Sequence, residues 1–272
     1  MLGKLIKHEF KHSARYIMTI YACAVAMMLF VLLAMFTKVA WISIVGSVVL
    51  YIVGLVSIVM TLVSIIKNFY DSLYGVQGYL SFTLPVKCSS LLFSKIIMSF
   101  FWVIASFLIM GLSILIITLN AKKQADGTLD GMWDTIKMSG ILEILPSGKM
   151  MIEYAAVILL VVFLAILTFI GFVYFSVTVA NTRPLQNHPK IFGFIIFFAS
   201  YGITNSIGAK LTYSFPLAVN ISSDKLAITL KAMENSQALM SFGLAGTIFN
   251  ALVAVGLLVA TGYIMEHKVN IK

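Results

Sequence analysis

Hydrophobic residues along this chain are grouped in long blocks, and charged residues gather between the blocks. Six stretches carry no Asp, Glu, Lys or Arg: 16–37, 39–66, 96–121, 154–182, 191–209 and 235–265. A helix needs about 20 residues to cross a hydrocarbon core about 30 Å thick. Each stretch therefore predicts one membrane-spanning helix, the last over 238–265. The short alternating segments of a transmembrane barrel are absent from the sequence.

The fifth stretch differs from the others because its second half is small and polar. Residues 201–208 read Tyr-Gly-Ile-Thr-Asn-Ser-Ile-Gly. Glycine and small polar side chains weaken a helix and lower its affinity for lipid. We therefore expect the fifth span to be broken or only partly inserted.

Composition supports a membrane environment. The chain is 61% hydrophobic and 11% charged, whereas soluble domains carry about 25% charged residues. Cys23 and Cys88 give neither a disulfide framework nor a metal-ligand spacing, and we interpret both as small apolar side chains.

The distribution of charge predicts which ends face the cytoplasm. With the N-terminus inside, the cytoplasmic segments hold eleven of the 19 Lys and Arg residues but only three of the ten acids. Such a bias is the usual signal for orientation. It predicts N-in, C-in topology and attraction to anionic lipid, and it requires no nucleic acid. The extracellular loops then cover 122–153 and 210–234, each expected to form a short helix with turns.

The N-terminal residues 1–15 predict an amphipathic interfacial helix, or elbow, leading into the span. Its apolar residues lie on one face and its basic residues on another. The apolar set is Leu2, Leu5, Ile6 and Phe10, and the basic set is Lys4, Lys7, Lys11 and Arg15.

The same segment matches H-E-x-x-H at His8, Glu9 and His12, a zinc metalloprotease pattern. A catalytic zinc also needs a third ligand, and the surrounding cations disfavour a dication. A membrane metalloprotease therefore remains an alternative, ranked below the interfacial helix.

The segment 67–95, between the second and third spans, combines a cytoplasmic position with many aromatic residues. Gly75 and Gly78 permit turns, and Pro85 ends a helix. A short semi-apolar helix here suits docking into a partner's groove. An ordinary surface loop with interfacial Tyr and Phe explains the pattern equally well.

This segment resembles the ABC-2 type permeases of Gram-positive bacteria. The similarity lies in Leu73-Tyr74-Gly75-x-x-Gly78-Tyr79-Leu80-x-Phe82-Thr83-Leu84-Pro85-Val86, and it extends to residues 4–11. The resemblance implies short cytoplasmic coupling helices that meet an ATPase, with a second contact at 181–190. The implied coupling residues are Tyr74, Gly75, Gly78, Tyr79, Leu80, Phe82, Leu84, Pro85 and Arg183. Val76-Gln77 stands where the family often has an acidic pair, so the charge contact there must differ.

Two further features bear on the energy source. The chain lacks G-x-x-x-x-G-K-[ST], so an ATPase would be a separate chain that carries ATP and Mg²⁺. No charge lies inside the six stretches, which argues against an ion-coupled transporter. Small residues spaced by four, Ala22/Ala26, Gly202/Ser206 and Gly256/Ala260, are expected to pack helices together.

The sequence thus predicts an all-α, multi-pass protein of a bacterial plasma membrane. We interpret it as a non-enzymatic permease subunit of an ATP-binding-cassette exporter for an amphipathic peptide, lipid or drug. The expected partners are a cytoplasmic ATPase and a second permease, in a homo- or heterodimer. It is expected to hold no cofactor. A membrane scaffold or immunity protein is the remaining alternative.

Overall fold

A computed structural model describes the backbone of residues 2–36, 40–75, 78, 88–126, 149–182, 184–185, 187–215, 218–221, 226–229 and 240–267. Within these ranges, six helices are long and apolar enough to cross a membrane, which confirms the predicted six-span, all-α class. They are α1 (Leu2–Ala34), α2 (Ala40–Leu73), α4 (Cys88–Asp126), α6 (Lys149–Ala180), α7 (Pro189–Ser214) and α8 (Leu244–His267).

The helices extend beyond most of the charge-free stretches. Helix α1 runs without interruption through 2–34, so the expected elbow and the first span form one helix. Helix α2 ends seven residues later than its stretch, and α4 begins at Cys88 rather than at 96. The charged residues near these ends therefore lie on helices, because a charged side chain does not interrupt the pairing of the helix backbone.

The expectation of a broken fifth span was wrong. Helix α7 is continuous over 26 residues, with Pro189 in its first turn and the Phe215 N–H donating to Leu211 O at its end. Pro189 suits a helix start because its missing N–H has no acceptor there anyway. The hydroxyls of Ser200, Ser206 and Thr212 inside α7 donate to carbonyls one turn earlier, as Ser206 Oγ does to Gly202 O. These bonds satisfy the polar side chains without interrupting the helix.

The loop after α7 also differs from the expected short helix. It contains three short strands, β1 (Ala218–Ile221), β2 (Leu226–Thr229) and β3 (Met240–Gly243). They form an antiparallel sheet of order β2-β1-β3, in which Ala218 pairs with both Thr229 and Gly243. β3 continues directly into α8, so the last helix begins at Leu244 rather than at 238. The loop expected at 122–153 falls largely outside the described residues.

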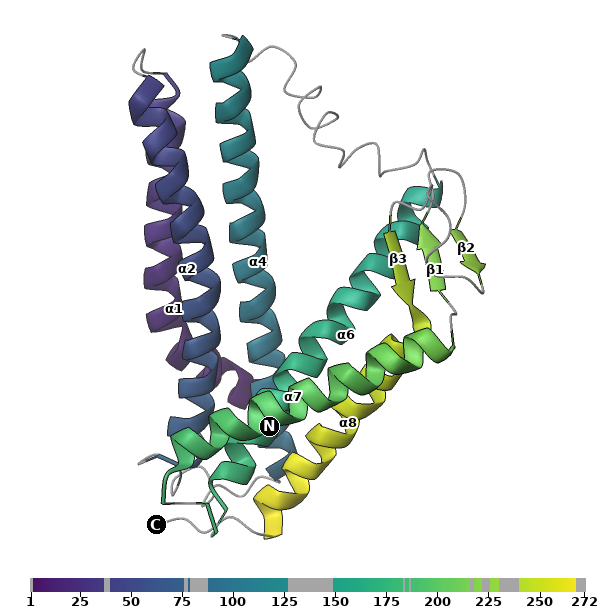
Figure 1. Cartoon of the computed structure of the whole chain (residues 1–272). Helices are drawn as coiled ribbons and strands as arrows, with labels where there is room; N and C mark the ends of the chain where they lie inside the picture. Colours follow the sequence, from purple (N-terminus) through teal and green to yellow (C-terminus); the bar gives the residue numbers. More distant parts are fainter. Residues whose placement is uncertain are drawn as a thin grey trace. The chain divides into compact units, whose positions relative to one another are not determined.

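The chain divides into two compact units, Met1–Ser139 and Gly140–Lys272. In the first, α1, α2 and α4 run alongside one another and each packs on the other two (Figure 1). One apolar cluster joins the three helices: Met28, Val31, Leu50 and Ile116, flanked by Met27, Leu32, Ile109 and Ile117. A Cβ at Gly54 would lie 2.8 Å from Met110 Sδ, so the missing side chain permits the close approach of α2 and α4.

In the second unit, α6 packs on both α7 and α8, and these two also pack on each other. Helix α6 approaches α8 closely at Gly171, where a Cβ would lie 3.4 Å from Ala254 O. Aromatic rings fill the α6–α7 contact, with Phe172 against Tyr201 and Phe169 against Phe197 at 5.6 and 5.8 Å between centroids.

Of the six small residues expected to pack helices together, only Ala260 is half-buried. Ala22, Ala26, Gly202 and Ser206 are exposed, and nothing approaches the Cβ position of Gly256 within 4 Å. Spacing by four places residues on one face of a helix but does not say which face meets a neighbour.

Candidate functional site

A buried ion pair joins the N-terminal part of α1 to the first turns of α4. Lys95 Nζ lies 2.8 Å from Glu9 Oε1, and the two side chains are 3% and 14% exposed. Among the described residues this is the one ion pair within 4 Å. Ionisable groups within spanning helices are costly to bury, so a buried pair is a candidate for function.

Helix α2 contributes Asn68 to the same cluster. Its amide nitrogen donates to Glu9 Oε2 over 3.3 Å. Its amide oxygen lies 3.0 Å from Nδ1 of His12. Because an amide oxygen can only accept, Nδ1 of His12 is the donor of this hydrogen bond. Glu9, Asn68 and Lys95, one from each helix, therefore form a hydrogen-bonded connection that we name the latch.

Next to the latch lies an aromatic layer, formed by the rings of Phe10, Tyr21 and Trp102. The indole N–H of Trp102 donates to Ser13 Oγ over 2.9 Å, and Ser13 in turn donates to Glu9 O over 2.7 Å. Phe10 stacks on Trp102 with 5.4 Å between ring centroids. The Tyr21 hydroxyl donates to Trp102 O over 3.0 Å. Rings and latch together fix the orientation of residues 9–21 of α1 against α4.

The end of α2 is held by a compact turn. The N–H groups of Tyr74 and Gly75 both donate to Tyr70 O, over 2.7 and 3.0 Å, which satisfies a carbonyl that the helix leaves open. A Cβ at Gly75 would lie 2.7 Å from Asp71 O, and one at Gly78 would collide with Leu73 O. Glycine is therefore required at both positions by close backbone approach.

Three of the predicted coupling residues lie together at this turn. The Tyr74 ring is 6.2 Å from the ring of buried Phe69, and Gly78 N–H donates to Gly75 O over 2.9 Å. The other predicted coupling residues lie outside the described part of the chain: Tyr79, Leu80, Phe82, Leu84, Pro85 and Arg183.

The predicted elbow residues separate into two groups. Phe10 joins the aromatic layer, whereas the side chains of Lys7, Lys11 and Arg15 are exposed. Lys4 lies in α1, and its side chain is outside the described residues. Whether this part of α1 lies at the membrane surface stays a prediction.

The latch was missed by the sequence analysis, which placed every charge outside the spans. Lys95 immediately precedes a charge-free stretch, and it lies in the second turn of α4 because that helix begins at Cys88. A signal was present, since Glu9 is the one acid among the first 70 residues. An acid on an otherwise basic helix needs a cationic partner, and the sequence alone offers many.

The geometry also bears on the H-E-x-x-H pattern. The Glu9 carboxylate accepts hydrogen bonds from Lys95 and Asn68, and His12 is bonded to Asn68. A metalloprotease of this type uses its glutamate to activate a metal-bound water. In this arrangement both oxygens of Glu9 are already occupied. Among the described residues, no three His, Cys, Asp or Glu side chains are grouped as metal ligands.

A second polar cluster joins the N-terminal end of α2 to the C-terminal end of α4, far from the latch along both helices. Asn120, which is 2% exposed, donates to Ser43 O and to Ser47 Oγ over 2.8 and 2.6 Å. Gln124 donates to Ser43 Oγ over 2.9 Å. Unit 1 is therefore held by polar contacts near both ends of α4 and by apolar contacts between them.

The latch binds helices together, and its charges neutralise each other. Such an arrangement suits mechanical connection more than proton transfer or ligand capture. No family model matches the chain, and comparisons with curated proteins and with solved structures find no match either.

Proposed function

We propose that this chain is the membrane permease subunit of an ATP-binding-cassette exporter. Six candidate spanning helices supply the membrane domain. The similarity of residues 73–86 and 4–11 to ABC-2 permeases favours this class over other membrane proteins. A separate ATPase supplies the energy, and the transported substrate is an amphipathic peptide, lipid or drug.

One observation carries the proposal: the end of α2 is tied to both of its neighbours. The turn at 74–78 begins five residues after buried Phe69. Asn68, the residue before Phe69, bonds to Glu9 on α1. Glu9 in turn binds Lys95 on α4. A force applied to the coupling segment therefore acts on three helices through short bonds rather than on one flexible loop. Such coupling between a contact and a helix bundle is what a two-state exporter requires.

Coexpression of this chain with a P-loop ATPase subunit from the same organism tests the proposal. We expect the two chains to purify as a complex with ATPase activity. Tyr79→Asp and Leu84→Asp place a charge on the predicted docking surface, so each should weaken the complex and lower hydrolysis.

Tyr213→Asp serves as the matched control. Tyr213 is exposed near the C-terminal end of α7, whereas the predicted contact at 181–190 lies next to the N-terminal end of that helix. This variant should keep both complex and activity. Full complex and full hydrolysis in both coupling variants would remove 67–84 as the contact. Failure of any such ATPase to bind the wild-type chain would favour a scaffold or immunity protein.

A further inference from the structure

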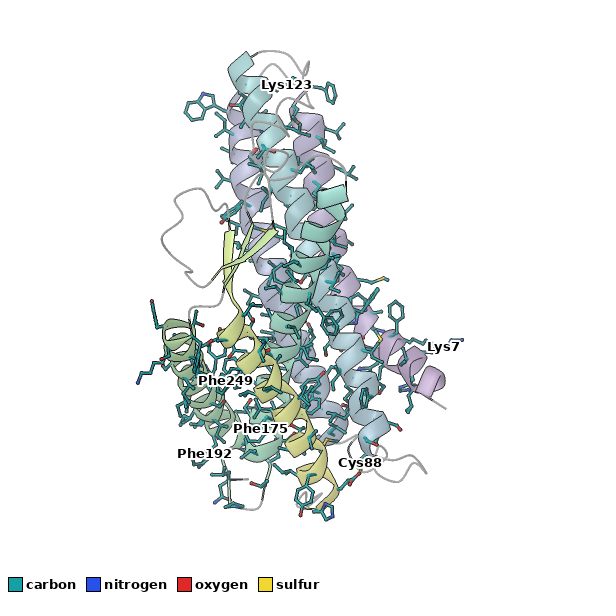
Figure 2. All side chains as sticks on the ribbon, turned by 90° about the vertical axis from the view of Figure 1, so that its right-hand side faces the viewer. Lys7, Cys88, Lys123, Phe175, Phe192 and Phe249 are labelled. Atoms are coloured by element: carbon teal, nitrogen blue, oxygen red, sulfur yellow. The ribbon has the colours of Figure 1, made fainter. Side chains whose placement is uncertain are left out.

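The N-terminal half of α1 carries a stripe of exposed basic side chains. Lys7, Lys11 and Arg15 recur every four residues, so they lie on one face of the helix, and all three are exposed. His8 and His12 border the same face. Figure 2 shows Lys7 pointing away from α4. We call Lys7, Lys11 and Arg15 the basic stripe.

No acid opposes this positive charge within the stripe. Glu9 is the one acid of α1, and it points toward α4, where Lys95 neutralises it. Among the described residues, none of the three stripe cations has a carboxylate within 4 Å. The latch therefore removes the only negative charge of α1 from the exposed face and leaves that face strongly cationic.

Helix α2 extends the cationic surface. Lys67 Nζ lies 5.6 Å from the centroid of the Tyr16 ring, so it stands next to the end of the stripe. Asp71 follows one turn later on α2 and makes no ion pair with Lys67. Two helices thus present cations at the same level.

The stripe ends where the apolar part of α1 begins. After Arg15 the helix carries no charged residue up to Ala34, and the first side chain of that part, Tyr16, is 62% exposed. Exposed tyrosine is typical of the boundary between headgroups and hydrocarbon. If the following turns span the bilayer, the stripe lies within one to three turns of that boundary. At a rise of about 1.5 Å per residue, this is the depth of the headgroups.

We propose that the basic stripe is a docking surface for anionic phospholipid headgroups. The charge of the stripe complements the phosphate of an acidic lipid such as phosphatidylglycerol, and its position places it beside that phosphate. Each Lys or Arg near an anionic membrane surface strengthens binding about fivefold. The inference is independent of any transport activity, because it rests only on α1, the latch and Lys67.

A fluorescence quenching experiment on the full chain in lipid nanodiscs tests this proposal. Bimane is attached at His8→Cys, with Cys23→Ala and Cys88→Ser removing the natural thiols. Quenching by a doxyl-labelled phosphatidylglycerol is compared with quenching by the matching phosphatidylcholine. We expect the acidic lipid to associate with the labelled site at least about fivefold more strongly than phosphatidylcholine does, and therefore to quench the bimane more strongly.

Lys7→Gln/Lys11→Gln should lower this preference by about fivefold or more. The control Lys190→Gln/Lys210→Gln removes the same charge from exposed positions of α7 and should leave it unchanged. Raising the ionic strength to about 1 M shortens the screening length to about 3 Å and should abolish the preference in the unaltered stripe.

Equal quenching by the two lipids at low salt, or an unchanged preference in Lys7→Gln/Lys11→Gln, would overturn the proposal. So would displacement of the acidic lipid by inorganic phosphate at equal ionic strength, since that result indicates a site for a free anion. Because the salt titration uses the unaltered stripe, it tests the proposal even if the double variant fails to fold.

Discussion

Removing one partner of the latch should destabilise the first unit. In Glu9→Gln, Lys95 keeps its charge at a position that is 3% exposed but loses the carboxylate 2.8 Å away. At that distance, the gross attraction is about 6 kcal/mol with an effective dielectric constant of about 20. Desolvation offsets much of this attraction in the intact pair. The lost partner, however, leaves an uncompensated buried charge, which costs about 3–5 kcal/mol in fully buried pairs.

Because Glu9 is 14% exposed, water relieves part of that cost, and we expect about 3 kcal/mol for Glu9→Gln. Thermal unfolding of the purified protein in detergent measures the effect. Lys210→Gln is the control, because this exposed lysine has no carboxylate within 4 Å among the described residues. It should change the free energy of unfolding by less than about 0.5 kcal/mol.

A double-mutant cycle then isolates the pair itself. Lys95→Met removes the orphaned charge, so Glu9→Gln/Lys95→Met should be more stable than the sum of the two single changes predicts. We expect a coupling of about 1–3 kcal/mol. Strictly additive effects, or a neutral Glu9→Gln, would refute the reasoning, because either result means that the two charges do not depend on each other.

Three other predictions follow from local contacts. Gly75→Ala should destabilise the protein by about 1–3 kcal/mol because its Cβ would collide with a backbone carbonyl, whereas Gly111→Ala, with open space around it, should be neutral or stabilising in the same thermal assay. Asn120→Leu should cost about 1–3 kcal/mol in thermal unfolding, since two hydrogen bonds between α2 and α4 are lost; an unchanged midpoint would contradict this. Metal analysis of the purified chain should find no stoichiometric zinc, because Glu9 and His12 are already bonded; one zinc per chain, lost in His8→Ala, would revive the metalloprotease alternative.

The confirmed prediction, six long apolar helices, depends only on lipid being the solvent of the chain. Long blocks without charge must be helical in lipid, because hydrocarbon offers no partner for backbone N–H and C=O groups. Six such blocks therefore predict six helices, whatever their neighbours are. Helix ends were less predictable, since a charge near an end does not stop a helix, and α1, α2 and α4 all extend through charged residues.

Which residues meet was decided by tertiary structure alone. The sequence shows that Glu9 is an isolated acid among cations and that Gly75 and Gly78 permit turns. It does not show that Glu9 faces Lys95, 86 residues later, with Asn68 between them. Partner choice depends on the rotation and register of three helices, which are set by side-chain shape along their whole length. The solvent thus determines the spans, and helix contacts determine the latch and leave the basic stripe exposed.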